Sequence, residues 1–150
     1  MNEEKRQHLE FIQNTINRMN TNSFQIKGMA ITIVSALLAV YVINQNVVFI
    51  FLAILPTILF WILDSYYLLQ ERKLRGIYDD VTGLKNIIEI KPYEMPLDKY
   101  TKKINKRYSF CCSFFSKIFL LSYLSITILL TLIGLVMNKY GCFIFQGVKK

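Results

Sequence analysis

Charged residues are scarce in this 150-residue chain and are absent from two long stretches. They make up 19% of the residues and hydrophobic residues make up 53%, against about 25% and about 45–50% in a typical soluble domain. Residues 28–63 and 118–138 contain no charged side chain. So short a chain cannot cover such apolar runs with its remaining residues, so we expect lipid to surround them. This distribution excludes an ordinary soluble enzyme, a disulfide scaffold and a disordered tail.

Residues that commonly carry catalysis are equally few. The chain has one histidine, His8, and no glycine-rich phosphate loop, HExxH, GxSxG or CxxC motif. Cys111 and Cys112 are adjacent, which is not the spacing of a metal or redox site, and we expect buried or inert thiols. The sequence therefore predicts a protein that is not an enzyme, with no catalytic residue, cofactor or metal.

The apolar runs have the lengths of membrane-spanning helices. The polar turn Asn44-Gln45-Asn46 divides the first run, and with flanking residues the two spans cover about 27–43 and 47–69. So short a turn makes them an antiparallel transmembrane hairpin, residues 27–69, and residues 118–138 form a third span. The predicted fold class is an all-α integral membrane protein with three crossings.

Basic residues predict the orientation of the spans. Four precede residue 28, none lies in the hairpin turn, and eleven lie between the second and third spans. We therefore expect the amino terminus and the helical and loop segment 70–117 to be cytoplasmic. The hairpin turn and the short tail 139–150 are then outside.

Residues 1–26 are predicted to form an amphipathic cytoplasmic helix. Apolar side chains recur at three- and four-residue steps from Leu9 to Met19, and the polar run 20–23 is predicted to end the helix. The apolar face could lie on the membrane surface, against the cytoplasmic part of the second span, or against a second subunit. We favour packing against protein, because a surface-binding helix usually carries more basic residues.

The second span is predicted to continue into the cytoplasm as one helix, from about residue 47 to 81. Gly83 is expected to be its C-cap. Residues 86–90 are rich in β-branched side chains and favour a short strand. Asp98 is expected to cap a basic helix over 99–108.

Asp64 and Lys27 are the most informative charged residues. Asp64 ends the second span at about the depth where Lys27 opens the first. Because a carboxylate at this depth is costly unless it is paired, we expect a Lys27–Asp64 ion pair. The alternative is that Asp64 lines an ion pathway as one of a ring of carboxylates in an oligomer.

Other candidate residues lie within the spans. Gly28, Thr32 and Ala36 form a small-xxx-small stripe, which is typical of close helix packing within a chain or between subunits. Pro56 is expected to kink the second span, and the kink could act as a gate hinge. The third span has a weak polar stripe that could face a pore or another helix. This stripe is Thr127, Thr131 and Asn138.

A basic cluster precedes the third span. It consists of Lys99, Lys102, Lys103, Lys106 and Arg107. Basic residues beside a span are expected from the positive-inside rule and from attraction to anionic lipid, so lipid is the favoured partner. A nucleotide or another anionic ligand is the alternative, and nucleic acid is not expected.

The order of these parts carries a resemblance. A polar helical start is followed by RMNTNSFQIKG, which leads into the hairpin, and WILDSYYLLQERKLRGIYDDV leaves it. Over about residues 9–81 this layout resembles small bacterial multi-spanning membrane proteins of uncharacterised function, and loosely the SLATT-type effectors. The hairpin of SLATT-type effectors is thought to form pores in nucleotide-signalled conflict and antiphage systems. The resemblance implies a bacterial inner-membrane protein, and it assigns no individual residue a role.

The functional expectation is an oligomeric membrane channel or membrane-disrupting effector, in bacterial defence as the resemblance implies, gated through its basic cytoplasmic layer. Oligomers are expected because three helices bury little of their own surface. The alternative is a non-conducting scaffold or adaptor that positions a cytoplasmic protein partner.

Overall fold

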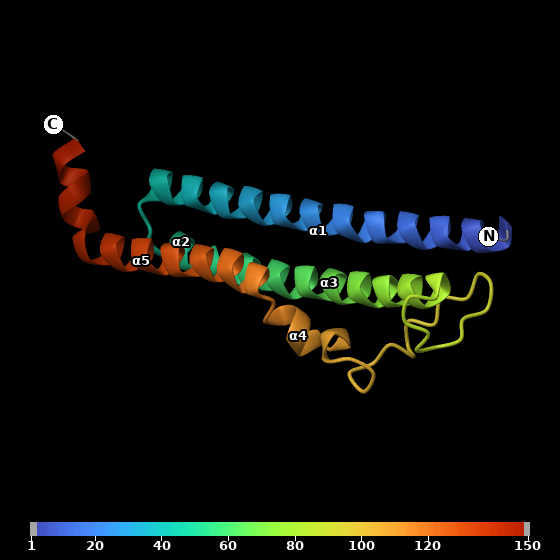
Figure 1. Ribbon diagram of the computed structural model, residues 1–150. Coiled ribbons are helices and arrows are strands. Elements are labelled where there is room, and N and C mark those ends of the chain that lie inside the picture. Colours follow the sequence, from blue (N-terminus) through green and yellow to red (C-terminus); the bar gives the residue numbers. More distant parts are fainter. Residues whose placement is uncertain (1–2, 149–150) are drawn as a thin grey trace. The chain divides into compact units, whose positions relative to one another are not determined.

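A computed structural model describes the backbone of residues 3–148, and the side chains of residues 3–117 and 119–139. These residues form helices and loops without a strand (Figure 1). The helices are α1 (Glu3–Asn44), α2 (Val48–Leu52), α3 (Ile54–Thr82), η1 (Lys106–Tyr108, a 3₁₀ helix), α4 (Phe110–Phe114) and α5 (Lys117–Val148). The predicted all-α class is confirmed for this part of the chain.

Three helical stretches are long and apolar enough to cross a membrane. They are Glu3–Asn44, Val48–Thr82 and Phe119–Lys139, and the mean hydropathy of their most apolar windows is 2.1, 2.2 and 2.4. Only 11%, 28% and 22% of these windows is buried inside the protein. Apolar helices that leave most of their surface uncovered fit a multi-pass membrane protein.

The chain forms two compact units, each built from two distant segments. We call Met1–Gln25 with Leu63–Ser116 the head unit, and Ile26–Ile62 with Lys117–Lys150 the span unit. Helices α1 and α3 each contribute residues to both units.

Helix α1 runs without interruption through residues 20–23, so the predicted end of the helix at this run is wrong. No glycine or proline interrupts the chain here. The Thr21 hydroxyl donates to the Asn17 carbonyl at 3.0 Å, which is a bond inside the helix and not a cap. A polar run alone therefore does not end this helix.

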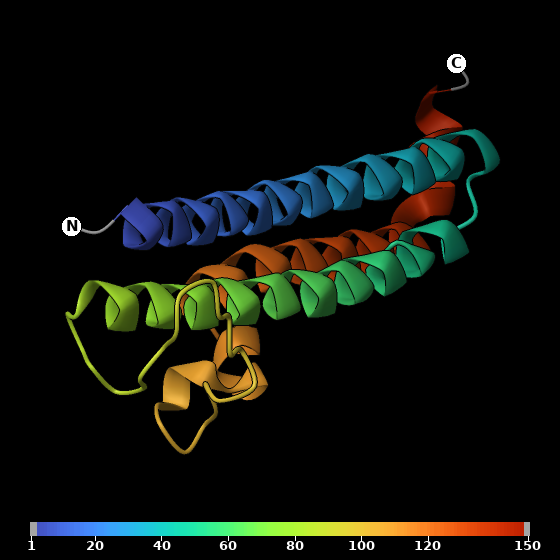
Figure 2. The same ribbon diagram turned by 90° about the vertical axis from the view of Figure 1, so that its right-hand side faces the viewer.

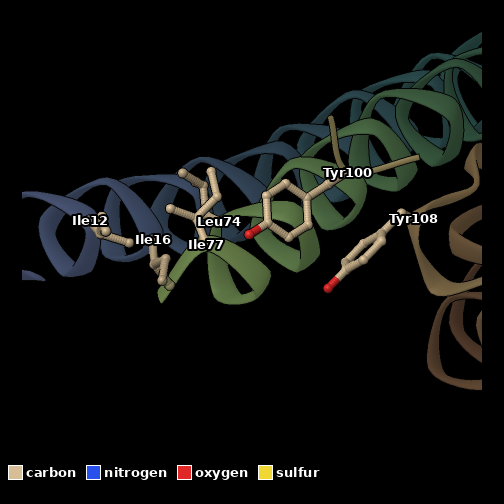
Figure 3. Close-up of a cluster of buried hydrophobic side chains, with 6 residues drawn as sticks. All are labelled: Ile12, Ile16, Leu74, Ile77, Tyr100 and Tyr108. Carbon is tan, nitrogen blue, oxygen red and sulfur yellow. The ribbon is translucent and has the colours of Figure 1, made fainter. Parts of the chain in front are cut away.

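The core of the head unit combines three segments (Figure 3). Ile12 and Ile16 come from α1, Leu74 and Ile77 from α3, and two tyrosines from the loop that follows α3. These tyrosines are Tyr100 and Tyr108. The apolar face of α1 could have packed on the membrane surface, on the same chain or on a second subunit. The structure shows it packed on the same chain.

Gly76 lets the two tyrosine rings approach α3 closely. A Cβ atom at this position would collide with the Tyr108 hydroxyl and lie 2.8 Å from Tyr100 Cε1. The two rings also meet edge to face, with centroids 5.3 Å apart. Burial raises the pKa of both hydroxyls, and the carboxylate of Asp80 raises that of Tyr100 further.

Gly83 ends α3 as expected. Its φ is 85°, and the amides of Gly83 and Leu84 donate to the Asp80 and Asp79 carbonyls at 3.1 and 2.9 Å. These two bonds form a Schellman motif, which requires a residue with positive φ at this position.

Residues 86–90 are a loop, so the predicted strand is wrong (Figure 2). The amides of Ile87 and Ile88 donate to the Asp80 carboxylate at 3.0 and 3.3 Å, and the Tyr100 hydroxyl donates to the same group. The Asp80 side chain thus accepts hydrogen bonds from backbone amides that, in a β-strand, would donate to a neighbouring strand.

The predicted basic helix over residues 99–108 is also wrong. Only Lys106–Tyr108 is helical, as a 3₁₀ turn in which the Asn105 side chain accepts from the Arg107 amide at 3.0 Å. In an α-helix the five basic side chains would stand three or four residues apart and repel one another. The irregular path also brings Tyr100 into the core.

In the span unit, the helix predicted over residues 47–81 is interrupted at Ala53, between α2 and α3. Pro56 has no N–H to donate to the Leu52 carbonyl, and its ring crowds that carbonyl. The interruption lies where Pro56 was expected to disturb the helix, and its use as a gate hinge stays a prediction. Helix α5 packs on α2 at Gly134, where a Cβ atom would lie 3.0 Å from the Phe51 ring.

Candidate functional site

Between residues 28 and 39, one exposed face of α1 carries only small side chains. This face, the α1 stripe, consists of Gly28, Thr32, Ser35, Ala36 and Ala39. A Cβ atom at Gly28 would have no neighbouring atom within 4 Å, and the Thr32 hydroxyl donates to the Gly28 carbonyl at 3.0 Å. Ala30 and Tyr41, on another face of α1, are buried. The predicted small-residue stripe is therefore left open within one protomer.

The polar stripe of α5 is only partly exposed. Thr127 and Thr131 are half-buried, and Asn138 is exposed. The Thr127 hydroxyl donates to the Tyr123 carbonyl at 2.8 Å, and that of Thr131 donates to the Thr127 carbonyl. Both hydroxyls are satisfied inside their own helix, and a pore-facing role for the three residues stays a prediction.

A small cavity of about 150 Å³ lies inside the span unit. It is lined by Ala30, Ile31, Val34, Thr57, Tyr123 and Ile126. The Thr57 hydroxyl is turned to its own helix, where it donates to the Ala53 carbonyl at 2.9 Å. The exposed lining of the cavity is apolar, so it offers an ion no polar group in place of water.

Asp64 is fully buried and belongs to the head unit. Its carboxylate accepts a hydrogen bond from the Ser23 hydroxyl of α1. Sequence reasoning missed Ser23, although it stands four residues before Lys27 and so on the same face of the helix. The Lys27–Asp64 ion pair and the ring-carboxylate role both stay predictions.

Lys27 belongs to the span unit. Its ammonium lies 4.7 Å from the centre of the Phe119 ring, at the start of α5, in a cation–π contact. Nearby, Trp61 of α3 stacks on Tyr123 of α5 with centroids 6.2 Å apart. Aromatic side chains thus join three helices at one end of the described spans.

The basic cluster is exposed in the head unit. Lys99 forms an ion pair with Glu94 at 3.3 Å. A hydrogen bond from the Lys91 amide and the nearby Lys99 ammonium hold the pKa of the Glu94 carboxyl below its usual value. The cluster lies on turns and one 3₁₀ helix, so its charges do not form a single helical face.

Sequence reasoning also missed a second basic surface. A cavity of about 440 Å³ in the head unit is bordered by Arg72, Arg75, Lys85 and Arg107. Arg72 donates to the Ser113 hydroxyl at 3.2 Å, while Arg75 and Lys85 are paired with Glu71 and Asp79 at 2.7 and 2.5 Å. Three of the four cationic side chains are thus already bonded to other residues of the head unit.

Cys111 and Cys112 are both exposed free thiols, so burial is wrong for this pair, and their inertness stays a prediction. The side chain of the third cysteine, Cys142, lies outside the described residues. Within the part of the chain that the structure describes, no three His, Cys, Asp or Glu side chains gather closely enough to hold a metal ion.

Comparisons with known proteins give no relative from which a function could be transferred. No family model matches the chain, and no curated protein or solved structure matches it. The likeness to SLATT-type effectors therefore stays an expectation, and the function has to be argued from the geometry above.

Proposed function

We propose that the protein works as a homo-oligomeric membrane assembly, a channel or membrane-disrupting effector of a bacterial inner membrane. The spans of neighbouring protomers meet along the α1 stripe. The observation that carries this proposal is the exposure of five small side chains on one face of an apolar helix. Small residues give helices in lipid a close approach of their backbones, which is the main source of helix association there.

The proposal places the conducting path between protomers. The cavity inside the span unit is small and apolar, so it offers an ion no route through a single protomer. The exposed Asn138 side chain of α5 is the group we propose for such a path, because Thr32 and Ser35 lie in the packed α1 stripe. Asp64 is buried and hydrogen-bonded, which favours a structural role for this carboxylate over a place in the pathway.

The head unit is proposed to be cytoplasmic, in accord with the distribution of basic residues. Its exposed basic cluster is then available to anionic lipid. If the head unit gates the channel, then binding of anionic lipid or another ligand to the head unit would open or close it.

Cross-linking tests the stripe directly. In a background with the three native cysteines replaced by serine, Ser35→Cys introduces a thiol in the α1 stripe, and Ile33→Cys introduces one on another exposed face of the same helix. We expect a short bismaleimide added to membranes to link the Ser35→Cys protomers and not the Ile33→Cys protomers. Equal linking of the two variants, or none, would overturn the proposed interface.

Vesicle leakage tests the activity. Gly28→Leu adds a side chain into open space, so the fold tolerates it while the helices of two protomers can no longer approach. We expect reconstituted wild-type protein to release a trapped dye, Gly28→Leu to lose the release, and the control Ile33→Phe to retain it. Cross-linked oligomers without leakage would contradict the channel and favour the scaffold.

A further inference from the structure

The head unit contains a cavity that the proposed function does not use. It has a volume of about 540 Å³ and lies between the first turns of α1, the end of α3 and the loop that follows α3. Sites for small molecules usually have about 300–1,000 Å³. Its charged or titratable lining residues are Glu4, Lys5, His8, Asp80 and Glu89.

His8 is buried in the wall of this cavity with unsatisfied hydrogen-bonding capacity. Its side chain is 2% exposed, and its Nε2 atom has no hydrogen-bond partner, the one such buried side-chain atom among the described residues. The Tyr93 ring lies 6.0 Å from the imidazole, and the Tyr93 hydroxyl donates to Gln7 at 2.7 Å. A buried polar atom without a partner is unfavourable, so a ligand that supplies a donor would be stabilised here.

The charge of the lining selects the kind of ligand. Three carboxylates face one ammonium group, in a chain whose net charge is +8 and which has only ten acidic residues. The Asp80 carboxylate is fixed by the Ile87 and Ile88 amides, at 3.0 and 3.3 Å, and by the Tyr100 hydroxyl. Glu4 and Glu89, which line the cavity, are exposed. Such a lining attracts cations and repels phosphates and carboxylates.

We infer that this cavity binds a small organic cation, a primary amine or diamine. One N–H of the ligand donates to His8 Nε2, which is covered in the free protein, so the imidazole turns toward the cavity when the ligand binds. The carboxylates of Glu4, Asp80 and Glu89 balance the ligand's charge. A metal ion is disfavoured because no three of these side chains come close enough to coordinate one. The site lies wholly within the head unit, so it does not depend on oligomer formation.

Equilibrium dialysis of radiolabelled putrescine against the full-length protein in detergent, at neutral pH, tests this site. We expect saturable binding that weakens about tenfold or more in His8→Leu and in the double variant Glu4→Gln/Glu89→Gln. Glu10→Gln removes one exposed carboxylate of α1 that does not line the cavity, and it should bind as the wild type does. Circular dichroism checks that each variant is folded. If His8→Leu does not fold, the binding measured for the double variant Glu4→Gln/Glu89→Gln is the deciding test.

A second probe separates hydrogen bonding from charge. Fully N-methylated putrescine keeps both positive charges but has no N–H to donate to His8, so it should bind about tenfold more weakly than putrescine. Absence of saturable putrescine binding, equal binding by the double variant and Glu10→Gln, or equal binding of the two diamines would each overturn the inference.

Discussion

Replacing Tyr100 by phenylalanine removes one buried hydroxyl from the centre of the head unit. The side chain is 0% exposed and its hydroxyl donates to the buried carboxylate of Asp80. A hydrogen bond to a charged group contributes about 1.5–3 kcal/mol. The Asp80 carboxylate keeps two backbone donors in the variant, so we expect the lower end, a loss of about 1.5 kcal/mol in the free energy of unfolding.

Urea unfolding of the detergent-solubilised protein, followed by the near-ultraviolet circular dichroism of its tyrosines, measures this loss. Tyr93→Phe is the matched control, because Tyr93 is 53% exposed and its hydroxyl bonds to the exposed Gln7. The control should lose less than about 1 kcal/mol. If the two variants lose the same free energy, the Asp80–Tyr100 bond does not hold the loop to α3 and the reasoning is refuted.

The same tyrosine predicts a dependence on alkaline pH. Burial and the Asp80 carboxylate raise the pKa of Tyr100 in the folded protein, so above about pH 10 the unfolded chain releases a proton that the folded protein retains. The contribution of the protonated Tyr100 to the free energy of unfolding is therefore complete below about pH 10. Above pH 10 the free energy of unfolding falls by about 1.4 kcal/mol per pH unit for each buried tyrosine whose pKa is raised. Tyr108 behaves alike, so Tyr100→Phe should reduce the alkaline slope without abolishing it. An unchanged slope would contradict the assignment.

Three further substitutions and one control, at Phe11, test buried contacts by the same unfolding assay. Gly76→Ala should cost about 1–3 kcal/mol because its methyl group would be pressed against two buried tyrosine rings. Ile12→Ala should cost about 2–5 kcal/mol because it opens a cavity in the core, whereas its neighbour Phe11 is 55% exposed and should cost about 1 kcal/mol or less on truncation. Ser23→Ala should cost about 1–3 kcal/mol because it removes a donor from the fully buried Asp64. Equal losses for Ile12 and Phe11, or no loss for Ser23, would contradict these contacts.

The sequence predicted the features that depend on local pattern. Long charge-free runs indicated the three helices that are long and apolar enough to cross a membrane, and Gly83 marked the end of α3 because a left-handed residue there favours glycine. The loop after α3 was predicted poorly, since its path depends on contacts between distant residues. Asp80 binds the amides that a strand at residues 86–90 would have used, and Tyr100 leaves a helical path to reach the core.

For the candidate site too, the sequence predicted what depends on local spacing and not what depends on contacts between distant residues. Spacing alone located the α1 stripe, but its exposure depends on which face of α1 the rest of the span unit covers. Ser23 was assigned to a helix end because its residue type favours caps, whereas it serves as the donor to a carboxylate 41 residues away. The basic surface around Arg72 and Arg75 needs the fold to bring Arg107 beside them.

The contrast between faces of α1 is the strongest argument that its stripe meets protein and not lipid. Large apolar side chains occupy other exposed positions of the same helix, as Met29, Ile31 and Ile33 show at 57%, 60% and 40% exposure. Large apolar side chains are well suited to contact with lipid. A helix face that contacts lipid does not need to consist of glycine, alanine, serine and threonine. The head unit has its own core, so Gly28→Leu should leave head-unit unfolding unchanged while it abolishes cross-linking at Ser35. A variant that stayed fully cross-linked would show that close backbone approach is not what joins the protomers.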